Sequence, residues 1–90
     1  MKVYLVTYDL KKFGKDYTGL YTALKSSYNW WHQLDSTWLV ATNESLVQVW
    51  NRIAPHLDLN DIALVIEVKR NYQGWLPKDA WDWINAYVPY

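Results

Sequence analysis

The chain has no cysteine, and it has only three glycines and three prolines among its 90 residues. Without cysteine it can form no disulfide, no zinc-thiolate site and no thiol nucleophile. We therefore expect a reducing compartment, with the cytoplasm as the default. The longest apolar run, Ile62 to Ile66, is far shorter than the roughly 20 residues that cross a bilayer, so we expect no membrane partner. The N-terminus also lacks the length and cleavage site of a signal peptide.

An excess of charge of one sign is also missing. Nine Lys and Arg residues balance nine Asp and Glu residues, which excludes a strong non-specific nucleic-acid binder. Any binding of phosphate must then be local. The basic residues do gather near two predicted strand ends, and these are the candidate nucleic-acid contacts: Lys11, Lys12, Lys15, Lys69 and Arg70. Two copies of the chain could bring such groups together even at zero net charge.

The pattern of apolar residues predicts one domain, 1–90, with a core in 1–68 and an aromatic extension in 69–90. Strands are expected at 2–8, 29–34, 37–42 and 61–68, because apolar and β-branched residues alternate there. Two helices lie between them, with Asp16 and Asn43 as expected caps. This order predicts an α+β, ferredoxin-like βαββαβ fold, an antiparallel four-stranded sheet with both helices on one face. Pro77 is placed to begin a short third helix.

The predicted sheet has apolar residues on both faces. In the first strand Val3 and Leu5 alternate with Tyr4 and Val6, so neither face suits water. Because the two helices cover only one face, the other needs a partner, and a second copy of the chain is the simplest one. The sequence therefore predicts a homodimer.

Asp9 ends the first strand, and three lysines follow it closely. A carboxylate at a strand exit can open a turn through its own side chain. It can also hold a hydrated cation, with the lysines attracting phosphate, which is nuclease or nucleotide chemistry. Mg²⁺ usually takes one or two carboxylates, so a catalytic Asp9 would need its twin in a symmetric dimer. Both interpretations of Asp9 stay open.

The chain resembles the superfamily of CRISPR-associated protein two, the small dimeric subunit of spacer acquisition, and of the virulence-associated protein D toxins. The resemblance covers residues 1–68. It rests on Tyr8-Asp9 at the strand end, on Ser36-Thr37-Trp38, and on Asp58 to Asp61 before the last strand.

That resemblance implies a ferredoxin-like homodimer packed sheet against sheet. Its strand-exit aspartate corresponds to Asp9, and two such residues can share Mg²⁺ in a metal-dependent phosphodiesterase or endoribonuclease. Other members of the superfamily are only scaffolds for DNA or a partner protein. Antiviral defence is the implied setting.

Seven tryptophans and eight tyrosines favour an alternative, a non-catalytic dimeric binding module or scaffold in phage-host defence or counter-defence. Trp38 and Trp50 lie on predicted apolar stripes and are expected in the core. The isolated His32 and His56 are expected to be structural. The five remaining tryptophans are candidate binding residues that would stack on bases or a nucleotide, or would anchor a protein partner. They are Trp30, Trp31, Trp75, Trp81 and Trp83.

Overall fold

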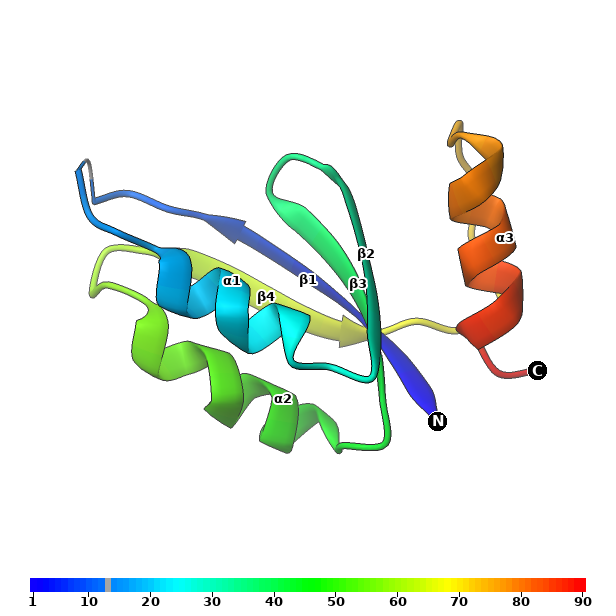
Figure 1. The fold of residues 1–90 in the computed structure, drawn as a ribbon, viewed down its shortest axis with the longest axis horizontal. Helices are drawn as coiled ribbons and strands as arrows, with labels where there is room; N and C mark the ends of the chain where they lie inside the picture. The colour runs from blue at the N-terminus through cyan, green and yellow to red at the C-terminus, as the bar shows by residue number, and fades with distance from the viewer. Residues whose placement is uncertain (13) are drawn as a thin grey trace.

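The computed structural model of the chain describes residues 1–12 and 14–90. Its elements follow the predicted order, including the third helix that was expected to begin at Pro77 (Figure 1). They are β1 (Lys2–Asp9), α1 (Thr18–Lys25), β2 (Asn29–Leu34), β3 (Thr37–Thr42), α2 (Leu46–Ile53), the 3-10 turn η1 (Ala54–His56), β4 (Ile62–Glu67) and α3 (Lys78–Tyr87). Both strands of the β2-β3 hairpin begin and end where the sequence predicted.

The four strands form one sheet in the order β2-β3-β1-β4, and each neighbouring pair is antiparallel. β1 lies between β3 and β4 and contributes residues to a core cluster on each face of the sheet. Tyr4 and Val6 point to one face, whereas Val3 and Leu5 point to the other. The α+β class and the antiparallel four-stranded sheet are therefore confirmed.

Helices α1 and α2 cover the first face of the sheet (Figure 1). Leu20 and Leu24 of α1, and Val49 and Ile53 of α2, are completely buried against it, as the spacing of the two apolar stripes predicts. Trp50 was expected beside them, but it is 37% exposed. It follows Val49 by one residue, which turns its side chain about 100° around the helix and toward the solvent.

The starts of α1 and α2 differ from the expected caps. The N-cap of α2 is Ser45 and not Asn43, because Ser45 and Gln48 form a capping box. This reciprocal pair satisfies two backbone N–H groups, which one asparagine side chain would not do. The N-cap of α1 is Tyr17, although the Asp16 carboxylate accepts a hydrogen bond from the backbone N–H of Thr18 at 2.9 Å.

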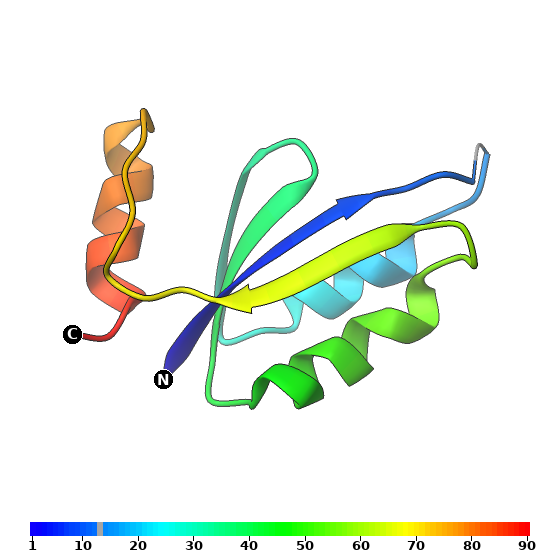
Figure 2. The same cartoon turned by 180° about the vertical axis from the view of Figure 1, so that it is seen from behind.

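The third helix, α3, packs on the second face of its own sheet. Ala80, Ile84 and Val88 are buried there and form a second core cluster with Val3 and Leu39, among others. Seen from behind, α3 lies beside the N-terminal end of β1, and the C-terminal part of β1 extends away from it together with β4 (Figure 2). The chain therefore covers by itself part of the face for which the sequence suggested a second copy.

Candidate functional site

Asp9 is the last residue of β1 and lies opposite Ile62 of β4. Its side chain is 65% exposed, and its Oδ2 atom lies 2.7 Å from Nζ of Lys11. A shallow hollow beside it is lined by Thr7, Leu64 and their neighbours. Among the described residues, no group of three or more His, Cys, Asp or Glu side chains could hold a metal ion. One chain thus offers Mg²⁺ a single carboxylate at this position, and that carboxylate already pairs with a lysine.

Asp61 fastens the loop after β1 to the loop before β4. Its carboxylate accepts hydrogen bonds from the backbone N–H of Lys11 at 2.7 Å and of Asp58 at 2.6 Å. The Tyr17 hydroxyl donates to the same carboxylate at 2.8 and 2.9 Å. Desolvation alone would raise the pKa of Asp61, but these bonds favour the charged form more strongly, so its pKa is lowered. Asp61 therefore has a structural role, because its hydrogen bonds hold the two loops together.

The same carboxylate affects Tyr17. Desolvation, followed by the hydrogen bond to Asp61, raises the pKa of the Tyr17 phenol. The sequence had marked Asp61 only as part of a family motif. No local signal connects it with a tyrosine 44 residues away, so this contact follows from the fold alone.

Lys12 and Lys15 face a third carboxylate, that of Asp58. Their Nζ atoms lie 3.6 and 3.8 Å from its Oδ2, and Lys15 also donates to the His56 carbonyl at 3.4 Å. With Asp9 beside Lys11 and Asp61 next to this pair, acidic side chains balance the three lysines. The loop is therefore nearly neutral, which weakens its attraction for phosphate.

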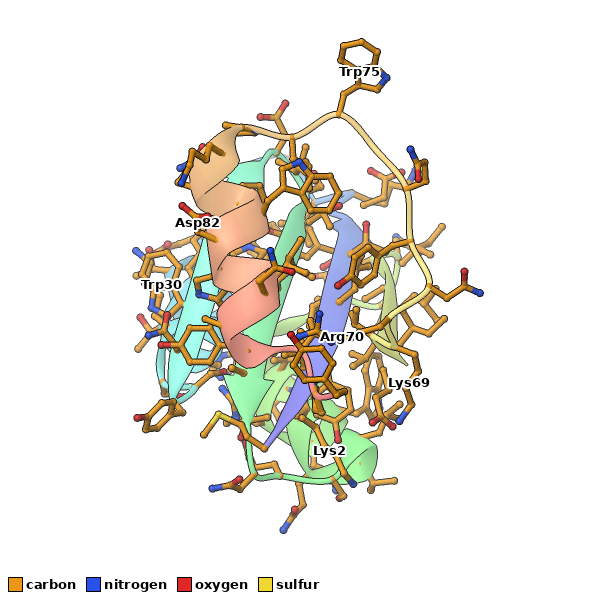
Figure 3. The ribbon with its side chains drawn as sticks, turned by 90° about the vertical axis from the view of Figure 1, so that its right-hand side faces the viewer. Lys2, Trp30, Lys69, Arg70, Trp75 and Asp82 are labelled. Atoms are coloured by element: carbon orange, nitrogen blue, oxygen red, sulfur yellow. The ribbon has the colours of Figure 1, made fainter. Side chains whose placement is uncertain are left out.

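Lys69 and Arg70, the other predicted phosphate contacts, lie near α3 (Figure 3). The Lys69 ammonium group is 2.8 Å from Glu67. The Arg70 guanidinium donates to the carbonyls of Val88 at 2.6 Å and of Pro89 at 3.2 Å, and it lies 3.7 Å from the centroid of the Tyr90 ring. Because cations near a helix C-terminus stabilise its free carbonyls, Arg70 serves to hold the end of α3.

The five candidate tryptophans have different environments. Trp31 is 7% exposed and faces α3, and Trp81 and Trp83 are partly buried in the same cluster. Trp30 is 38% exposed and lies 5.3 Å from the Trp38 ring. Trp75 is 99% exposed and projects from the loop before α3 (Figure 3). Of these five, Trp75 is the one whose entire surface is open to a partner.

Trp38 is the centre of an aromatic cluster under α1. It is 1% exposed, and its indole N–H donates to the Tyr8 hydroxyl at 2.9 Å. The His32 ring stacks on the Trp38 ring, with 3.9 Å between the ring centroids and 15° between the ring planes. The Nε2 atom of His32 lies 2.9 Å from the carbonyl oxygen of Asp35. This packing confirms the expectation that Trp38 is a core residue, and it gives His32 a structural role.

A cleft of about 150 Å³ lies between α3 and the sheet. Its lining has no charged residue and includes Leu5, Trp31, Tyr72 and Trp81. The indole N–H of Trp31 is buried and has no hydrogen-bond partner in the described part of the chain. Leaving a buried donor unpaired costs free energy, so the Trp31 N–H is a weak point of the second core cluster.

Beyond the reach of α3, the second face has an uncovered apolar strip on β4. Ile62, Leu64 and Ile66 point to this face, and they are 63%, 55% and 51% exposed. We call these three residues the β4 strip. Three large aliphatic side chains on one strand form a contiguous patch rather than scattered exposure, and such patches mark interaction surfaces.

The chain matches no protein-family model, no curated protein and no solved structure in the comparisons made. In the described ranges, no helix has the length and apolar character needed to span a membrane.

Proposed function

We propose that the protein is a dimeric scaffold of ferredoxin-like fold that binds a protein partner and has no catalytic activity of its own. The βαββαβ order of the strands and α-helices from β1 to β4 and the central place of β1 support this fold. The superfamily that the sequence resembles includes dimers that act only as scaffolds. The absence of cysteine supports a cytoplasmic setting.

One observation carries the proposal: the groups suited to phosphodiester chemistry are already engaged within the chain. Asp9 pairs with Lys11, and Lys12 and Lys15 face Asp58. A nuclease needs a carboxylate free for the metal and positive charge free for the backbone of its substrate. In the described part of the chain, Asp9 and these three lysines each have a partner of opposite charge.

The apolar surface, in contrast, is free to bind a partner. Trp75 is 99% exposed and can contact a partner protein, and the β4 strip offers three exposed aliphatic side chains to the second copy of the dimer. Tryptophan is enriched among the residues that contribute most to protein-protein affinity, because it buries a large rigid area. A protein partner therefore suits this surface better than a polyanion does.

A nuclease assay tests the proposal directly. The native chain, Asp9→Ala and Asp35→Ala would each be incubated with single-stranded RNA and with duplex DNA in the presence of Mg²⁺. Asp35 is the matched control, since it is an exposed aspartate in the β2-β3 turn. We expect no cleavage above background by any of the three. Cleavage by the native chain and by Asp35→Ala, but not by Asp9→Ala, would contradict the proposal.

Nucleic-acid binding without cleavage needs a second assay. Tryptophan fluorescence would be followed during titration with oligonucleotides and with mononucleotides. The scaffold proposal predicts an unchanged spectrum. Saturable quenching that disappears in Trp75→Phe would contradict the choice of a protein partner and favour base stacking on Trp75.

The second candidate is a metal-dependent endonuclease with Asp9 as catalytic and metal-binding residue. The observation in its favour is the 65% exposure of the Asp9 side chain beside an open hollow. It requires a dimer that brings two Asp9 carboxylates together. The assay with Asp9→Ala therefore separates the two candidates.

A further inference from the structure

The two edge strands of the sheet, β2 and β4, differ in a way that matters for assembly. β2 has a register irregularity between Trp31 and Leu34, and polar His32 and Gln33 lie within it. β4 has the sequence Ile-Ala-Leu-Val-Ile-Glu, without lysine, proline or glycine. Its pairing with β1 is regular over all six residues. Monomeric proteins usually protect an edge strand with bulges, charges or proline. Here β2 is protected and β4 is not.

The register of β1 and β4 shows which backbone groups of β4 are free. The N–H of Val68 donates to the Val3 carbonyl at 2.8 Å, so the hydrogen-bonded positions of β4 are the even-numbered ones. Ala63, Val65 and Glu67 therefore direct their N–H and C=O groups to the outer edge. No strand of the described chain lies beyond that edge (Figure 2).

The packing of α3 limits how a second copy can approach. In a dimer packed sheet against sheet, the second faces of the two copies would meet. Ala80 and Ile84 of α3, together with Val88 directly after it, already cover one part of that face. The free edge of β4 and the exposed β4 strip together form the surface that α3 leaves available.

We propose that two copies of the chain pair through β4, antiparallel and edge to edge, with Val65 on the two-fold axis. This inference rests on the dimer in the proposed function and specifies its geometry. The pairing satisfies the outward N–H and C=O groups of Ala63, Val65 and Glu67 in both copies. The two four-stranded sheets become one continuous sheet.

Side chains favour this register over a shift by one residue. With Val65 on the axis, Leu64 lies opposite Ile66 of the other copy, so the β4 strips of the two copies pack together. Glu67 then lies opposite Ala63, and Lys69 lies opposite Asp61. With Leu64 on the axis, Glu67 would face Asp61 instead, and like charges directly opposite one another are destabilising.

The geometry has a consequence for Asp9. Asp9 is aligned with Ile62, and in the dimer Ile62 is aligned with Val68 of the other copy. The two Asp9 residues are then three strand spacings apart sideways and six residues apart along the strand. That places them about 25 Å from one another, much too far to share one metal ion. The edge-to-edge dimer is thus a scaffold and excludes the paired-aspartate mechanism.

Disulfide cross-linking tests the register, because the native chain has no cysteine to interfere. Leu64→Cys and Ile66→Cys would be oxidised separately and as an equal mixture. Opposite residues at non-hydrogen-bonded positions have Cα atoms about 4.5 Å apart, within disulfide range. We expect the mixture to form a mixed dimer at least tenfold faster than either variant cross-links alone. No faster cross-linking in the mixture, or rapid cross-linking of Leu64→Cys alone, would overturn this register.

Charge repulsion at the same edge gives an independent test, read as mass by light scattering. The double substitution Leu64→Lys with Ile66→Lys places lysines opposite lysines, and it should give a folded monomer. The control is Val47→Lys, which replaces a 62% exposed aliphatic residue on α2 and should stay dimeric. A double variant that stays dimeric would overturn the edge geometry but leave a dimeric scaffold intact. A native chain that is monomeric would overturn both.

Discussion

Docking of α3 on its own sheet is the feature that most changes the expected surface, and Ile84→Ala tests it. Ile84 is 5% exposed, and it contacts the second core cluster from the middle of α3. Truncating a buried isoleucine to alanine costs about 2 to 5 kcal/mol of unfolding free energy. Ile84 also borders the cleft of about 150 Å³, where it has fewer neighbours to lose. We therefore expect the lower part of that range, about 2 to 3 kcal/mol.

Urea unfolding followed by far-UV circular dichroism would measure this loss. For a domain of this size the free energy falls by roughly 1 kcal/mol per molar urea, so the midpoint should drop by about 2 M or more. The matched control is Asn85→Ala, the next residue of α3, which is exposed and should change the free energy by less than about 0.5 kcal/mol. Equal midpoints for the two variants would refute the docking of α3.

Three other substitutions test particular contacts. Tyr8→Phe removes the acceptor of the buried Trp38 indole N–H and should cost about 1 to 3 kcal/mol in urea unfolding, whereas Tyr28→Phe, at a 71% exposed position, should cost nothing measurable. Asp61 has a lowered pKa in the folded state. Its carboxylate therefore contributes stability above its unfolded pKa of about 3.9, and this contribution disappears as the pH falls through the folded pKa. Asp61→Asn should be less stable than the native chain near neutral pH and should lose less stability on acidification, and identical stability profiles against pH would contradict this. The Arg70 guanidinium donates to carbonyls at the end of α3, so Arg70→Leu should speed amide hydrogen exchange in the last turn of that helix. Unchanged exchange there would show that Arg70 does not stabilise the helix end.

The sequence predicts the sheet well because its signals are local. Alternating apolar residues place β1 and β4, and Asp35-Ser36 between two β-branched and aromatic segments places the hairpin turn. The two helical stripes likewise predict which face of each helix is buried. Trp50 was assigned wrongly, because a stripe read from spacing alone does not show how deep each of its members lies.

The contacts between distant segments could not be predicted in the same way. Pro77 indicated that a helix begins, but nothing local indicates that α3 lies on its own sheet and not on that of a partner. The lysines after Asp9 have the composition of a phosphate site. Their actual partner, Asp58, is more than 40 residues away in the sequence and meets them only through the fold. Site chemistry read from clustered charges fails where the neutralising charges come from another loop.

The mass of the native chain in solution tests the central claim most directly. Light scattering would be measured across a wide range of protein concentrations, with the Leu64→Lys and Ile66→Lys double variant alongside. The dimeric scaffold predicts a mass of twice 10.8 kDa for the native chain, falling to 10.8 kDa only on dilution. A native mass of 10.8 kDa at every concentration would contradict the account.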